Sequence, residues 1–462
     1  MNRQRILVLA LALLICAAAA GSASAANVVL VNFDPPGVGL NDPTPAAPVG
    51  GNPGVTLGQQ RQFAYLFAAD LWGSVIDSAA DIFVGASFQP LTCSPTSGVL
   101  GSAGTTFIFR DFPAAQFALT WYHSALADAL AGIDLNPGFI DINSRFNSRI
   151  GTDPGCLVGS DWYYGIDHAA GNDFDFLNVV MHEIAHGLGF ANFVNEATGA
   201  LQSGFVDIYA LYTLDTTTGL TWDLMTNVER AASAVNDRNV VWNGPAVAAE
   251  APSVLGARPS VKVLQPKAIK GSYEAQPASF GPPLTGGGGT TGQIVLADDG
   301  VGATADACEP LVKKANGKLV LADRGVCAFT VKVANAQAAG AKGVIIANNV
   351  PVGLPGMGGA DPAITIPSVG ITQADGQAIR DELPHVNAKL ILDASQLAGA
   401  VDGLPRLYAP PMVALGSSIS HWDVSATPNL LMEPFINPDL RAAETLDLTP
   451  AQLQDIGWIL LP

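Results

Sequence analysis

Residues 174–190 have the sequence FDFLNVVMHEIAHGLGF, and this stretch decides the fold around it. Its apolar residues recur three or four positions apart, which predicts a helix over residues 173–188 with one face against a core. His182 and His186 are four positions apart, so both imidazoles lie on one face of that helix and can reach a single ion. Gly189 follows, and a glycine there favours a helix end.

The pattern His182-Glu183-Ile184-Ala185-His186 is typical of catalytic zinc sites, because imidazole nitrogen is a preferred zinc ligand. Glu183 lies between the two histidines on a neighbouring face of the helix. It is close to the ion without being a ligand, so it can take a proton from metal-activated water. The motif therefore predicts hydrolysis with Glu183 as general base.

The motif and its continuation to Phe190 resemble the metzincin metallopeptidases, whose pattern is H-E-x-x-H-x-x-G-x-x-H. Asn192 stands where that pattern has its third histidine, and a carboxamide is a poor zinc ligand beside imidazole. Farther along, residues 417–423 read SSISHWD and include His421, and Met432 follows. These segments resemble the leishmanolysin branch of the metzincins, in which an insertion precedes the third ligand. The resemblance implies that His421 is the third zinc ligand and that Met432 packs beneath the metal.

Other candidate ligands stay open at this point. Glu196 follows the motif and could complete the site as a carboxylate ligand, the arrangement of thermolysin. His168 could bind substrate or a second ion, or could be structural. Asp173 and Asp175 precede the predicted helix, where they are suited either to cap it or to bind Ca²⁺. The remaining histidines are His123, which precedes the motif, and His385, which follows it.

The middle of the chain, residues 268–400, resembles the protease-associated (PA) domain. The stretch that carries the resemblance begins DRGVCAF at residues 323–329 and continues through NAQAAGAKGVIIAN at residues 335–348. The resemblance implies a small β-rich α/β module without catalysis of its own, which acts as a lid or docking domain and can contact substrate. The glycine run at residues 286–289 lacks a following Lys-Ser/Thr pair and is expected to be a loop.

These assignments predict an α+β fold. A metzincin-like catalytic domain with a twisted sheet and long helices occupies residues 26–267 and returns at residues 401–462. The PA domain interrupts it, which costs little entropy if the two ends of the insertion lie together. Hydrophobic patterning predicts strands at 27–33, 81–88, 318–322, 343–348 and 388–392, and helices at 59–79, 121–131, 331–339 and after Thr449.

The N-terminus predicts a secreted protein. Arg3 and Arg5 precede an apolar run, and Ala23-Ser24-Ala25 fits a cleavage site, so residues 1–25 are expected to be a signal peptide. Four cysteines then remain, an even number that suits an oxidising compartment. Three pairings are possible, and we favour Cys93–Cys156 and Cys308–Cys327 because each stays within one expected domain.

Composition narrows the function further. The net charge of −18 argues against a nucleic-acid partner, and no stretch after the signal peptide is long and apolar enough to span a membrane. We therefore expect a secreted zinc endopeptidase that acts on protein or peptide substrates with one catalytic Zn²⁺. The alternative from another class is a secreted binding or adhesion protein with a degenerate zinc site.

Overall fold

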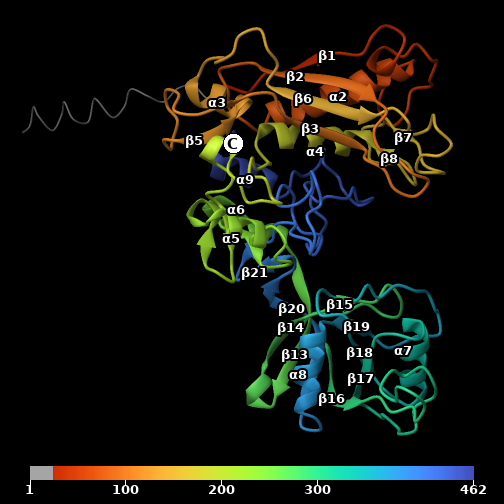
Figure 1. Cartoon of the computed structure of the whole chain (residues 1–462). Coiled ribbons are helices and arrows are strands. Elements are labelled where there is room, and N and C mark those ends of the chain that lie inside the picture. Colours follow the sequence, from red (N-terminus) through yellow and green to blue (C-terminus); the bar gives the residue numbers. More distant parts are fainter. Residues whose placement is uncertain (1–23) are drawn as a thin grey trace, which may run out of the picture.

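The computed structural model describes residues 24–462. The expected signal peptide, residues 1–25, lies outside this range except for its last two residues. Figure 1 shows an upper body, built from the first and last parts of the described chain, and a lower body built from its middle. Among the described residues, no helix combines the length and apolar character needed to cross a bilayer.

A four-stranded sheet is the frame of the upper body. Its strands lie in the order β1 (Val28–Asn32), β2 (Ile82–Gln89), β6 (Ile142–Asn147) and β3 (Gly101–Thr105). The first three run parallel, whereas β3 runs antiparallel to β6 and forms one edge. Ile142, Ser144 and Phe146 of β6 are all buried, as the two-residue repeat of a strand facing a core requires.

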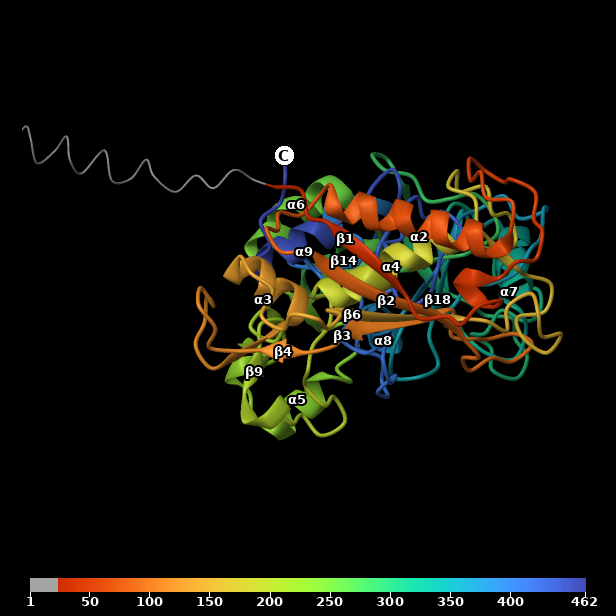
Figure 2. The same cartoon turned by 90° about the horizontal axis from the view of Figure 1, so that it is seen from above.

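Two long helices, α2 (Leu57–Gly73) and α4 (Phe176–Leu188), run side by side along the strands (Figure 2). The Trp72 indole of α2 donates a hydrogen bond of 3.0 Å to the carbonyl of Met181 in α4. The Tyr65 hydroxyl of α2 lies 2.9 Å from that of Ser144 in β6. These buried polar contacts fix the position of α4 against both the sheet and its neighbouring helix.

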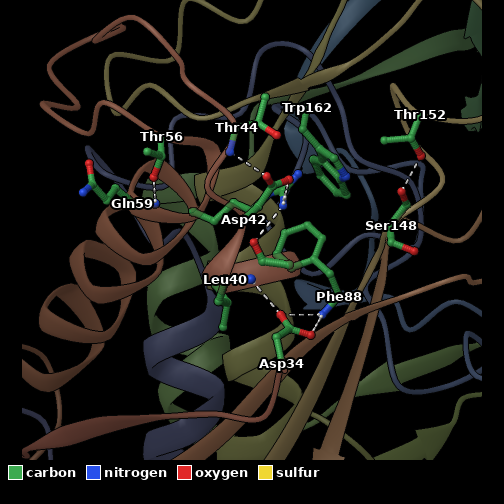
Figure 3. Close-up of polar contacts among 12 residues, drawn as sticks. Asp34, Leu40, Asp42, Thr44, Thr56, Gln59, Phe88, Ser148, Thr152 and Trp162 are labelled. Carbon is green, nitrogen blue, oxygen red and sulfur yellow. Dashed lines mark hydrogen bonds and ion pairs between the residues drawn. The ribbon is translucent and has the colours of Figure 1, made fainter. Parts of the chain in front are cut away.

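The loops at one end of the sheet are tied to each other by a carboxylate (Figure 3). Asp34 accepts hydrogen bonds from the backbone N–H of Leu40, at 2.7 Å, and of Phe88, at 3.0 Å. The guanidinium of Arg61, on α2, lies over the Phe88 ring at 4.5 Å. The loop after β1, the end of β2 and helix α2 are thereby held together.

Glycine at residue 187 is required by close packing between α4 and the sheet. A Cβ at this position would lie 2.2 Å from Cγ2 of Ile142 in β6. We expect Gly187→Ala to lower the free energy of unfolding by about 1–3 kcal/mol, because a methyl group forced into a filled core displaces its neighbours. Urea unfolding of the full chain measures this. Gly104→Ala is the matched control, since a Cβ there meets nothing within 4 Å; equal losses for both variants would contradict the packing argument.

The remaining elements of the upper body are short. They are β4 (Ile108–Phe109), β5 (Thr120–His123), α3 (Ser124–Ala131), β7 (Trp162–Tyr163), β8 (Phe174–Asp175), β9 (Val206–Asp207), β10 (Thr213–Asp215), β11 (Leu220–Thr221), α5 (Asn227–Ser233), β12 (Val240–Trp242), α6 (Pro245–Val254), β21 (Ala400–Val401), β22 (Leu404–Pro405) and α9 (Thr449–Ile456). Short 3-10 turns of the upper body lie at Gly39–Asn41, Gln202–Gly204 and Trp222–Leu224, and another, Lys267–Ile269, lies in the lower body.

The helix expected at residues 121–131 begins only at Ser124. Residues 120–123 instead form β5, which pairs with β4 and with β9. The apolar residues Trp121 and Tyr122 suit either element, and tertiary strand pairing decides between them.

The lower body contains an eight-stranded sheet with helices α7 (Phe329–Ala338) and α8 (Gln373–Asp381). The order is β14 (Gly271–Glu274), β13 (Ala257–Gln265), β20 (Asn387–Leu397), β16 (Thr290–Leu296), β17 (Leu319–Asp323), β18 (Gly343–Ala347), β19 (Ser368–Ile371) and β15 (Gln276–Pro277). We call residues 257–397 the inserted module. The sheet starts before the expected boundary at residue 268, because β13 pairs with β20 along most of its length.

The two connections of the inserted module to the upper body lie together. The backbone N–H of Ala398 donates to the carbonyl of Gly256 at 2.9 Å. Beyond this point the chain returns to the upper body, and its residues from Ala400 to Trp458 share one hydrophobic core with residues 26–255. The Trp458 indole, for example, donates to the carbonyl of Leu188 at the end of α4, at 2.8 Å.

Both favoured disulfide bonds are present in the structure. Cys93 pairs with Cys156 in the upper body, and Cys308 pairs with Cys327 in the inserted module. Each bond therefore joins residues within one body of the molecule. The structure as a whole is a mixed α/β chain with several separate sheets.

Candidate metal centre

Helix α4 presents His182, Glu183 and His186 because both of its ends are fixed. Asp175 caps the first turn by accepting a hydrogen bond from the backbone N–H of Asn178 at 3.3 Å. At the other end Gly189 has a φ of 133°, which a residue with a side chain rarely adopts. The chain therefore turns sharply after the helix.

A third imidazole reaches the same place from the last part of the chain. His421 lies beside a short extended segment, residues 406–408, and its carbonyl accepts a hydrogen bond from the backbone N–H of Tyr408 at 2.9 Å. The next residue, Trp422, forms an antiparallel bridge with Leu407. Segments distant in sequence thus bring His421 to the histidine pair of α4.

The three imidazoles converge through their Nε2 atoms. Nε2 of His182 lies 3.1 Å from Nε2 of His186 and 3.2 Å from Nε2 of His421. A tetrahedral ion with bonds of about 2.05 Å would hold its ligand nitrogens about 3.3 Å apart. All three residues belong to one group whose ligand atoms lie within 4.8 Å of each other.

Each imidazole has its other nitrogen fixed by a backbone carbonyl. His182 Nδ1 donates to Leu431 at 2.7 Å, His186 Nδ1 to Phe190 at 2.8 Å, and His421 Nδ1 to Ser417 at 2.8 Å. Since a carbonyl can only accept, Nδ1 carries the proton in each neutral ring, and Nε2 carries a lone pair.

Three lone pairs that face one another repel unless a cation lies between them. A proton is disfavoured in this position, because burial lowers the pKa of His182 to about 4 and that of His186 to about 3. Burial and the two neighbouring rings also lower the pKa of His421 well below its usual range. The donor set therefore fits a metal ion that prefers imidazole, such as Zn²⁺.

Glu183 is a buried carboxylate beside this group, with 5% of its surface exposed. Its Oε2 atom has no hydrogen-bond partner in the described structure. Burial raises the pKa of Glu183 to about 8, and the nearby backbone N–H of Ala103 partly opposes this. A Cβ on Gly101 would lie 2.7 Å from Oε1, so the edge strand β3 passes directly over the carboxylate.

Met432 lies in a buried turn that contacts two histidine-bearing segments. The preceding residue, Leu431, provides the carbonyl that fixes His182. The carbonyl of Met432 accepts a hydrogen bond of 2.8 Å from the backbone N–H of Trp422, next to His421. The position of the Met432 side chain beneath a metal stays a prediction.

The alternative residues have other roles in the structure. Glu196 lies outside the histidine group and accepts a hydrogen bond from the Asn192 amide at 3.1 Å. The same amide donates to the Ser420 hydroxyl at 3.0 Å, so Asn192 ties the turn after α4 to the residue before His421. His385 is exposed in the inserted module.

His168 is structural, because it bridges Asp175, at 2.7 Å, and the backbone N–H of Ala443, at 3.2 Å. Asp173 accepts a hydrogen bond from the backbone N–H of Asp161 at 2.8 Å. With Asp175 serving as the helix cap, these contacts account for both aspartates and give no support to the calcium interpretation.

Two features of the centre escape sequence reasoning. His123 is buried near the end of α4, its ring 4.5 Å from that of Phe193, yet the described structure gives neither ring nitrogen a partner that meets hydrogen-bond geometry. Gly101 is required by the approach of β3 to Glu183, which no local sequence pattern reveals.

Residues 290–379 match the family model of the PA domain. The inserted module contains a PA domain. This match supports the resemblance seen in the sequence of the module, but it does not extend to His182, His186 or His421. The metzincin resemblance of the remaining chain therefore stays a prediction.

Curated relatives match only part of the chain. Vacuolar-sorting receptor 2 of Arabidopsis thaliana is 33% identical over 140 residues, covering 27% of this chain and 22% of that protein. Leucine aminopeptidase 2 of Arthroderma otae is 41% identical over 104 residues, covering 22% of this chain and 19% of that protein. The chain thus spans about a fifth of the length of these relatives.

Solved structures give the same partial picture. An aminopeptidase from Aneurinibacillus sp. strain AM-1 is 28% identical, over 30% of this chain and 31% of that chain, with a TM-score of 0.24. The zinc aminopeptidase BSAP from Bacillus subtilis is 20% identical, over 44% of this chain and 45% of that chain, with a TM-score of 0.22. With these TM-scores, neither similarity extends to the whole fold.

Proposed function

We propose that this chain is a secreted, zinc-dependent endopeptidase. The convergence of three Nε2 lone pairs beside a buried, unpartnered carboxylate carries the proposal. His182, His186 and His421 would hold the ion, and Glu183 would be the general base. Bound zinc would supply Lewis-acid chemistry, polarising the scissile carbonyl and acidifying water.

The carboxylate of Glu183 is suited to move a proton in both directions. Its Oε2 atom is buried and has no hydrogen-bond partner in the described structure, so it is available to accept a proton and later release it. Glu183 would first take the proton of the attacking water and then pass it to the leaving amine. Burial keeps bulk water away from the carboxylate during this transfer.

The edge strand β3 offers a way to bind an extended peptide. Within the described sheet, β3 pairs with β6 on one side only, so its other backbone edge, where the Ala103 N–H lies near the Glu183 carboxylate, would pair with a substrate strand. Gly101, Ala103 and Gly104 keep the side chains of this strand small, and Glu183 lies directly under it. Such pairing would let a substrate extend on both sides of the metal, as an endopeptidase requires.

Two further features support the compartment and the organisation. Both disulfide bonds suit an oxidising, extracellular environment, which agrees with the expected signal peptide. The PA domain would serve as a docking or access module for protein substrates.

A digest of two peptides with the same internal sequence tests the proposal, one with a free N-terminus and one N-acetylated. We expect the full chain, purified with zinc, to cleave both at internal bonds and to lose this activity with a chelator. Activity should return when zinc is added back, because the ion is expected to be the exchangeable component.

Three other outcomes would contradict the proposal. If single residues are released from the N-terminus of the unblocked peptide and the acetylated peptide is not cleaved, the chain is an aminopeptidase. Bound zinc without any hydrolysis, unchanged by Glu183→Gln, would indicate the secreted binding protein with a degenerate site. Cleavage that persists after complete metal removal would exclude a metallopeptidase altogether.

A further inference from the structure

The base of the inserted module rests on the segment that follows His421. The backbone N–H of Gly256, at the entry to the module, donates to the carbonyl of Thr427 at 2.7 Å. At the exit, a Cβ on Gly399 would lie 2.5 Å from Cα of Ala426. Both connections of the module therefore contact residues only a few positions beyond the third histidine.

A charged cluster joins the module to the upper body at the same place. Glu274, at the end of β14 in the module, accepts two hydrogen bonds from the guanidinium of Arg406, at 3.0 and 2.8 Å, and pairs with Arg238 as well. The side chain of Arg406 is only 6% exposed and that of Glu274 only 15%. We call Glu274, Arg406 and Arg238 the Glu274 cluster.

Arg406 begins the extended segment that holds the third histidine. Its carbonyl accepts a hydrogen bond of 2.9 Å from the backbone N–H of Asp423. Two residues on, the backbone N–H of Tyr408 donates to the carbonyl of His421, also at 2.9 Å. Of these two backbone hydrogen bonds to residues 406–408, His421 thus makes one and Asp423 makes the other.

The turn before His421 needs this support. Ile419 is a buried β-branched residue with a φ of 66°, a left-handed conformation that costs free energy and persists only where its surroundings hold it. Its backbone N–H donates to the carbonyl of Tyr408 at 2.7 Å, and its carbonyl accepts from the Tyr209 hydroxyl at 2.8 Å. Movement of residues 406–408 would release the first of these contacts.

We propose that Glu274 of the inserted module is a positioning residue for the metal centre. Through Arg406 it holds residues 406–408 in place. Those residues in turn hold the Ile419 turn and His421. The module therefore completes the metal site mechanically, although it supplies no ligand, and the inference rests on the proposed function of His421 as a ligand.

The charge of Glu274 is what the cluster depends on. Burial alone would raise the pKa of this carboxyl, but the hydrogen bonds and charges of Arg406 and Arg238 lower it to about 2. Glu274 is therefore ionised at neutral pH. Without the carboxylate, two guanidinium groups would face each other in a largely buried place, which favours their separation.

The test measures zinc release from the full, zinc-loaded chain into a chromophoric chelator. We expect Glu274→Gln to accelerate release about 10–100-fold, the effect usual for losing a group that supports a metal ligand. Asp323→Asn is the matched control, because it removes the ion pair of Asp323 with Arg380 elsewhere in the module. This control should release zinc at the parental rate.

A double variant separates positioning from general destabilisation. In a His421→Ala background, Glu274→Gln should accelerate zinc release no further, because the ligand through which it acts is gone. An equal acceleration in that background, or a parental rate for Glu274→Gln alone, would overturn the inference while leaving the metal centre intact. If His421→Ala itself leaves zinc release unchanged, the proposed metal centre fails and the role of Glu274 fails with it. The cobalt(II) spectrum of Glu274→Gln adds a second readout, since loss of a ligand changes the coordination of the ion.

Discussion

Replacement of Glu183 by Gln is expected to lower kcat/KM for peptide hydrolysis by about 10²–10⁴-fold, the usual contribution of a general base. Zinc should stay bound, because the proposed ligands are the three histidines and the amide keeps the shape of the carboxylate. Steady-state kinetics together with the zinc content of the purified variant measure both parts. Loss of zinc along with activity would show instead that Glu183 is a ligand.

Although Glu183→Gln is expected to lower activity, we expect it to increase the stability of the metal-free protein at pH 8. Burial raises the pKa of Glu183 from 4.5 to about 8, so folding favours its protonated form. The stability that this form contributes is fully present below pH 4.5 and is lost as the pH rises toward 8. Glu183→Gln should therefore unfold at higher urea concentration than the parent at pH 8, and at a similar concentration at pH 4, when both are measured with a chelator.

Glu196→Gln provides the matched control for the kinetic measurement. Glu196 is the rival third ligand, lies on the turn after α4 and is held by the Asn192 amide rather than by the histidine group. Its substitution should leave kcat/KM within a few-fold of the parent. A loss comparable to that of Glu183→Gln would refute the assignment of His421 and favour the thermolysin-like arrangement.

The sequence predicts helix α4 well because the information is local. Periodicity, the Asp175 cap and Gly189 define α4 within a few residues, and the spacing of His182 and His186 follows from helix geometry. His421 could be suggested only by resemblance, since no spacing rule connects it to a motif on the other side of a folded module. The sheet of that module extends to residues before 268, because β13 pairs with β20, a strand so far along the chain that no local pattern connects the two.

Contacts between the two bodies lie beyond such reasoning altogether. Glu274 and Arg406 belong to segments without any motif, and their pairing depends on how the module docks. Gly101 is an ordinary strand residue in sequence, yet it gives the Glu183 carboxylate its room. Local patterns thus predict the proposed chemistry, whereas the supports of the site arise from tertiary packing.

His421→Ala is expected to have a large effect on metal binding. Two imidazoles from one helical turn would remain, and they leave the ion without a ligand on the side that His421 occupies. We expect zinc to dissociate more than about 100-fold faster than from the parent, beyond the range usual for losing only a supporting hydrogen bond. The measurement is zinc content after dialysis against a weak chelator, followed by the rate of release.

His385→Ala is the control for this experiment, because His385 is an exposed histidine in the inserted module and far from the motif in sequence. It should keep one zinc per chain. His182→Ala should resemble His421→Ala if the three rings act as one ligand set, since each has its Nδ1 fixed by a carbonyl and presents only Nε2. Equal zinc retention by the His421 and His385 variants would mean that the third imidazole is not a ligand. A cation other than a metal bound by all three rings would then have to lie between the Nε2 atoms. A proton shared between the rings is disfavoured, because burial lowers the pKa of each histidine.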